Sequence, residues 1–203
     1  MKKNKLITGA VLLGIATLTL TGCSEIPQEK IDAANVAIQG AKDSGASNYA
    51  SNEFIALQDS MKSALASIEE ENSKFFLFKN YDAPTKKLES VVVYAGEVAV
   101  LAEAKKEALK KEILVAINEI NILIEENNQL IAAAPKGKEG DSALMAIKGE
   151  LETIQVTVTE SNGLLQRGEL LASLEKAKAA KDKSIAINTE LTDVISKYKG
   201  AKK

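Results

Sequence analysis

An unbroken heptad pattern in the middle of the chain constrains its fold more than any other feature. Small or apolar residues, with two polar exceptions, recur at alternating steps of four and three from Leu88 to Ala134. The positions are Leu88, Val92, Ala95, Ala99, Ala102, Lys106, Leu109, Ile113, Ala116, Ile120, Leu123, Asn127, Leu130 and Ala134. Such a seam predicts a coiled-coil helix. A helix from Asp82 to Ala134 would be about 80 Å long at 1.5 Å per residue, which is too long for the wall of a compact globule.

Lys106 and Asn127 are the two polar residues of this seam. One interpretation is a ligand or register site, because a single buried asparagine can fix how helices align. The other interpretation, which we favour, is that Lys106 extends its ammonium group to water where one bundle ends and the next begins.

Shorter amphipathic patterns precede the long helix. A helix over about 29–44 should end at Gly45, and Ser51 or Asn52 should cap a second helix. The apolar stripe of the second helix is Phe54, Leu57, Met61, Ala64, Ile68 and Phe75. The break at 79–82 offers Asp82 as the N-cap of the long helix.

Two further helices are expected after Pro135. Asp141 or Ser142 can cap the first, although Thr153 to Thr159 also alternates like a strand. A single strand would have nothing to pair with, so we predict a helix there. Gly163 and Gly168 mark the following turn, and a last helix should run from about 170 to 197.

The predicted fold is all-α: an elongated helical bundle of two three-helix units that share the central helix, about 82–134. The arrangement resembles spectrin-type repeats in architecture. A single folded-back bundle with a kink at 105–111 is the alternative, because a dense polar stretch lies there. The expected segments are an N-terminal segment (1–22), a short tether (23–28), a first helical unit (29–107), a second helical unit (108–199) and a lysine-rich tail (200–203).

The first 22 residues have the features of an export leader, since three lysines precede the uncharged apolar stretch Leu6 to Thr21. The stretch is short for a transmembrane anchor. It ends in Leu20-Thr21-Gly22-Cys23, which resembles the lipobox of bacterial lipoproteins. The resemblance implies that signal peptidase recognises Leu20, Thr21 and Gly22 and cuts before Cys23. It also implies a diacylglycerol on the Cys23 sulfur and an acyl chain such as palmitate on its amino group.

A lipid-anchored protein of the cell envelope is therefore expected. Several acyl chains on one residue exceed the two-signal threshold for stable membrane anchoring. Ser24 follows the cysteine, and the resemblance implies sorting to the outer membrane, facing the periplasm or the surface, in bacteria with two membranes. In bacteria with one membrane, it implies the outer face of the cytoplasmic membrane.

The stretch Ala33 to Val91 also resembles an alanine-rich helical domain, of unassigned function, found in bacterial envelope lipoproteins. The matching features are Ala46-Ser47-Asn48-Tyr49-Ala50 and Lys79-Asn80-Tyr81-Asp82-Ala83. Lys79 stands where such domains often carry a glycine. The resemblance implies no chemistry.

Composition argues against an enzyme. The chain has no histidine, and Cys23 is its only cysteine, so it lacks the parts of a catalytic triad or of a His/Cys zinc site. It has no glycine-rich phosphate loop, and we expect neither a metal nor a cofactor beyond the lipid. Nucleic acid is not an expected partner, because the net charge is −2 and Arg167 is the only arginine.

Two remaining features suggest partners. Phe75, Phe76 and Phe78 fall within four residues; they either dock a partner protein or, in the interpretation we favour, cover the open end of the first unit beside Tyr81. The C-terminus, ending at Lys203, resembles the lysine-ended tail of murein lipoproteins, which implies attachment to peptidoglycan.

The leading hypothesis is a structural spacer or protein-interaction module with envelope protein partners. A wall tether and a carrier of an apolar ligand are the alternatives.

Overall fold

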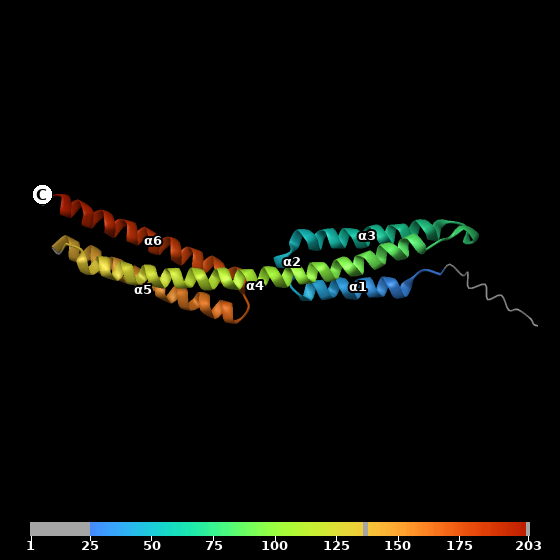
Figure 1. Ribbon diagram of the computed structural model, residues 1–203, viewed down its shortest axis with the longest axis horizontal. Coiled ribbons are helices and arrows are strands. Elements are labelled where there is room, and N and C mark those ends of the chain that lie inside the picture. The colour runs from blue at the N-terminus through green and yellow to red at the C-terminus, as the bar shows by residue number, and fades with distance from the viewer. Residues whose placement is uncertain (1–24, 136–137, 202–203) are drawn as a thin grey trace, which may run out of the picture.

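The computed structural model describes residues 25–135 and 138–201, and every regular element within them is a helix (Figure 1). The elements are α1 (Gln28–Asp43), α2 (Ala46–Tyr49), α3 (Ser51–Ser73), the short 3-10 helix η1 (Phe76–Phe78), α4 (Asp82–Ala133), α5 (Lys138–Gln166) and α6 (Leu170–Ala201). The all-α prediction and the long central helix are confirmed. The lipobox 20–23 and Lys203 lie outside the described residues.

The molecule is a rod with α4 along its axis. Helices α1 and α3 pack along the first half of α4, and α5 and α6 pack along the second half (Figure 1). Each half encloses its own hydrophobic core; along α4 the first core extends to Ala102 and the second begins at Ile113. Because α4 is continuous through 105–111, the chain does not form the alternative folded-back bundle.

The two halves are repeats in the same chain order. In each unit the last helix contacts both other helices, whereas the first and second helices touch at few points. The buried residues of the last helix also recur at one constant offset. Tyr81, Pro84, Leu88, Val91, Ala95, Val98 and Ala102 correspond to Leu170, Ser173, Ala177, Ala180, Ser184, Ile187 and Leu191. Helices α4 and α6 therefore carry the same spacing of buried residues, and in each unit this buried face packs against the other two helices.

The buried face of α4 differs in part from the predicted seam. Val91 and Val98 are buried, whereas the predicted Val92 is 37% exposed and Ala99 is half-buried. Further along, Ile124 and Ile131 take the place of Leu123 and Leu130. The difference arises because α4 contacts more than one helix in the first unit, so its buried face is wider than a two-stranded seam.

The beginnings of the helices correct several predicted caps. The short α2 was not predicted, and α3 follows it without a side-chain cap from Ser51 or Asn52. At the start of α4 the Asp82 carboxylate is not the cap; its backbone N–H instead donates to Asn80 Oδ1 at 2.8 Å. Helix α5 begins at Lys138, before the predicted caps at 141–142.

Two glycines with positive φ end helices. Gly45 (φ 83°) ends α1 as predicted, and Gly168 (φ 79°) makes the turn after α5. This left-handed conformation is costly for residues with a side chain. Gly163 lies inside α5 rather than in the turn, and α6 continues beyond the predicted end at 197. Residues 153–159 are helical, so the strand-like alternation did not produce a strand.

Candidate interaction surfaces

The connection between α3 and α4 ends the rod in an exposed apolar tip, which we define as Phe75–Phe78. Its four side chains are 61–73% exposed. The favoured sequence interpretation, that the phenylalanines cover the end of the core, is therefore wrong. Tyr81 closes the core there and is buried. Phe75 was also placed on the apolar stripe of α3, but α3 ends at Ser73, before the chain reaches it.

The Phe75 ring of the tip contacts the rings of Phe76 and Phe78, and none of the three belongs to the first core. The ring centroids of Phe75 and Phe76 are 4.6 Å apart, and those of Phe75 and Phe78 are 6.3 Å apart. Both pairs are tilted, an arrangement that aromatic rings prefer over flat stacking. The tip is thus a small preformed apolar cluster on the outside of the molecule.

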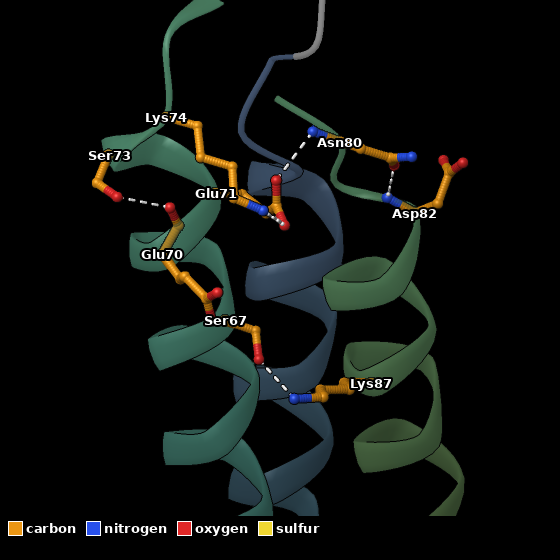
Figure 2. A network of polar contacts seen from close by, with 8 residues as sticks. All are labelled: Ser67, Glu70, Glu71, Ser73, Lys74, Asn80, Asp82 and Lys87. Carbon is orange, nitrogen blue, oxygen red and sulfur yellow. Dashed lines mark hydrogen bonds and ion pairs between the residues drawn. The ribbon is translucent and has the colours of Figure 1, made fainter. Parts of the chain in front are cut away.

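Polar contacts join the tip to the last turn of α3. Lys74 Nζ donates to Glu71 Oε1 at 2.6 Å, and the Asn80 backbone N–H donates to Glu71 Oε2 at 3.1 Å (Figure 2). Lys79 Nζ donates to Asn72 Oδ1 at 2.9 Å. Both lysines that flank the apolar tip therefore turn their ammonium groups back toward the rod.

These contacts perturb the titration of Glu71. The hydrogen bond from Lys74, followed by that from the Asn80 backbone, lowers the pKa of the Glu71 carboxyl below its ordinary 4.5. The same pair raises the pKa of Lys74. Sequence reasoning missed this network, because Glu71 stands in a run of three glutamates that resembles a solvated helix face.

The corresponding connection in the second unit is different. Helix α5 joins α6 through the polar turn 167–169, where the N–H of Glu169 donates to the Leu164 carbonyl and that of Gly168 to the Leu165 carbonyl. This is the Schellman pattern of a helix end. Beside it, the buried hydroxyl of Ser161 donates to the Ser173 carbonyl at 2.9 Å, and the Ser173 hydroxyl donates to the Ser161 carbonyl at 2.8 Å. The sequence analysis did not single out this pair.

The two polar residues of the α4 seam have different environments. Lys106 Nζ reaches the exposed carboxylate of Glu103 at 2.8 Å, so its position matches the favoured interpretation. It lies between the cores, near Tyr49, which packs against both of them. Asn127 is fully buried, and its Nδ2 donates to the Ser184 carbonyl on α6 at 2.9 Å. Asn127 therefore fixes the register of α4 against α6, although no side chain or backbone group of the described residues hydrogen-bonds its Oδ1.

An open groove of about 680 Å³ lies between α3 and α4. Ala56, Ser60, Ser63 and Tyr94 are among the residues that line it. Side chains of α1, α3 and α4 fill the first core beside it. The charged residues among those that line the groove are Asp59 and Lys87, one of each sign.

The described residues contain neither a metal-ligand cluster nor a membrane-spanning helix. No three His, Cys, Asp or Glu side chains in this part of the chain are placed to hold a metal ion. None of its helices has the length and apolarity needed to cross a membrane. Comparisons with family models, curated proteins and solved structures found no match to the chain.

Proposed function

We propose that the chain is a lipid-anchored bacterial envelope protein that acts as a non-catalytic spacer and presents its far end to partners. The observation that supports this role is the placement of the two ends of the described chain. Residues 25–27 leave α1 at one end of the rod, and α6 ends at the other (Figure 1). The 52 residues of α4 alone extend about 80 Å at 1.5 Å per residue.

The anchor in this proposal is Cys23, acylated after cleavage of residues 1–22. Metabolic labelling with a palmitate analogue and membrane fractionation test it. We expect labelled protein in the outer-membrane fraction of an organism with two membranes. Cys23→Ser should abolish both the label and the cleavage, whereas the matched control Ser24→Ala should retain them. A cleaved, membrane-bound Cys23→Ser chain would refute the anchor.

The spacer role predicts that envelope protein partners gather at the far end of the rod. Photo-crosslinking amino acids placed in cells at Val194 on α6 and Val36 on α1 test this, because both side chains are exposed. We expect discrete adducts from position 194 and none from position 36. Adducts only at position 36 would contradict a spacer that presents its distal end.

A second candidate function is attachment to peptidoglycan through Lys203. The supporting observation is that α6 ends at the end of the rod opposite residues 25–27 (Figure 1). Detergent-boiled cell walls should then release the protein only after muramidase digestion. Deleting Lys202 and Lys203 should abolish the wall-bound form, and protein recovered fully free of the wall would exclude this function.

A further inference from the structure

The exposed tip lies at the end of the rod from which the N-terminal chain leaves. Helices α1 and α4 start at this same end: Lys30, in the first turn of α1, pairs with Glu89 of α4 at 2.7 Å. Figures 1 and 2 show the segment before α1 leaving at the end of the rod where α3 ends and α4 starts. The chain that leads to Cys23 therefore leaves the rod next to the apolar tip.

Little chain separates this exit from the proposed anchor. Glu25 is the first described residue, and two peptide units can span at most about 7 Å. A lipid on Cys23 would thus enter a bilayer close to the level of the tip. The surface of that bilayer would be the nearest apolar phase for the four exposed side chains of Phe75–Phe78.

We propose that the Phe75–Phe78 tip inserts into the surface of the lipid bilayer as a second contact beside the lipid of Cys23. Amphipathic side chains near a membrane keep charged ends at the headgroups and apolar parts in the acyl region. The tip has this polarity, because the Lys74 and Lys79 ammonium groups bind Glu71 and Asn72 on the rod side of the apolar cluster. No acidic residue interrupts 74–79.

The repeat in the second unit supports a role beyond packing. The equivalent connection, 167–169, joins its helices with three residues and without an apolar cluster. Joining two helices therefore does not require four exposed apolar residues, and monomeric proteins rarely keep such a patch in water. A single lipid would let the rod pivot, whereas a second contact at its base holds the rod away from the bilayer. This inference rests on the proposed anchor and adds the orientation of the spacer.

Depth-dependent quenching in reconstituted vesicles tests the insertion. The lipidated protein carrying Leu77→Cys is labelled with an environment-sensitive fluorophore; acylation protects Cys23, the only native cysteine. The vesicles contain phosphatidylethanolamine and phosphatidylglycerol, with or without phosphatidylcholine brominated on its acyl chains. We expect blue-shifted emission that the brominated lipid quenches. The same label at Ser142→Cys, near the far end of the rod, should stay in water.

Serine substitutions test whether the quenching depends on the tip or on exposed apolar residues in general. Changing Phe75, Phe76 and Phe78 to Ser should abolish quenching at position 77. The matched control changes the exposed Val93, Val100 and Leu114 of α4 to Ser and should leave it unchanged. Circular dichroism checks that both variants keep their helices.

The outcomes distinguish this inference from the proposed function. Mass spectrometry of the Cys23 peptide reports acylation, and its absence from cell-derived protein would refute the anchor. Acylated protein whose label at position 77 stays in water would refute insertion and leave the anchor standing. A label that is shielded in native membranes but not in vesicles would assign the tip to a protein partner and overturn the inference.

Discussion

The two three-helix units share one chain order but fill their interiors differently. The first core contains only apolar residues, and nearly half of them are alanines, such as Ala34, Ala41 and Ala95. The second core is rich in isoleucine. All four buried polar residues of the described chain, Asn127, Ser161, Ser173 and Ser184, belong to the helices of the second unit. Small side chains let helices approach closely, whereas polar pairs fix register through hydrogen bonds. The same fold is thus specified in two ways.

The units also differ at their second connection. The α3–α4 connection carries the apolar tip at one end of the rod, whereas the α5–α6 turn is short, polar and near the middle (Figure 1). When two units of the same fold differ in a connection, that part of the connection is not required for the helices to pack. The apolar tip is therefore not required for packing, which supports the proposed role of its exposed phenylalanines in an interaction.

The largest expected effect comes from removing a fully buried side chain in either core. Leu88→Ala in the first unit and Ile120→Ala in the second should each lower the free energy of unfolding by about 2–5 kcal/mol through lost burial and a cavity. Urea denaturation followed by circular dichroism measures the loss. Val93→Ala, at an exposed position of the same helix, is the control and should change little.

The same experiment asks whether the units unfold together. Tyr49, Tyr81 and Tyr94 pack in or against the first core, so tyrosine fluorescence reports mainly that unit, while circular dichroism reports all helices. We expect coincident transitions in both variants, because α4 passes through both cores and Tyr49 contacts both. Separate transitions would show that the units are thermodynamically independent.

Two helix-ending glycines provide a finer comparison. Gly168→Ala should cost about 1–2 kcal/mol because alanine must adopt a left-handed conformation, with no atom in its way. Gly45→Ala has the same backbone cost and adds a contact of its Cβ with the Tyr49 ring at 3.0 Å. Denaturation midpoints should therefore fall further for Gly45→Ala. The reverse order would mean that the junction around Tyr49 adjusts freely.

Replacing the buried Asn127 tests whether a polar residue in the second unit lowers its free energy of unfolding. Asn127→Leu should raise the free energy of unfolding by about 1 kcal/mol, because it removes a buried oxygen that no described residue hydrogen-bonds. The neighbouring Asn128→Leu, on the exposed face, should have almost no effect. Destabilisation by Asn127→Leu would show that the bond to the Ser184 carbonyl outweighs the unpartnered oxygen.

Periodicity predicted the architecture because it is a local property of the chain. The heptad pattern and the break at 79–82 located α4 to within a residue at each end, and the phase of the preceding helix was correct for Leu57, Met61 and Ile68. The sequence alone did not show that Val91 rather than Val92 would be buried, because this depends on how many helices surround α4.

Features that depend on distant partners were not predictable. An apolar run such as 75–78 suggests burial, but within the described residues its side chains stay exposed. The Ser161–Ser173 pair resembles two ordinary polar residues until the turn brings their hydroxyls to each other's carbonyls. The lipobox expected at 20–23 stays a prediction, because a linear signal that other enzymes read does not depend on the fold of the rod.

The smallest expected effect is local to the tip network and depends on pH. The pKa of Glu71 is lowered in the folded chain by Lys74 and the Asn80 N–H, so the contribution of this network is present at neutral pH and lost as the pH falls through that lowered pKa. The Asn80 amide resonance should therefore titrate with a midpoint below 4.5, the ordinary value for Glu. Lys74→Met should move the midpoint back toward 4.5, because it removes the main cause of the shift. An unchanged midpoint in Lys74→Met would mean that the backbone donor alone holds the Glu71 carboxylate. The bond between the Asn80 N–H and Glu71 would then form without the Lys74 ion pair.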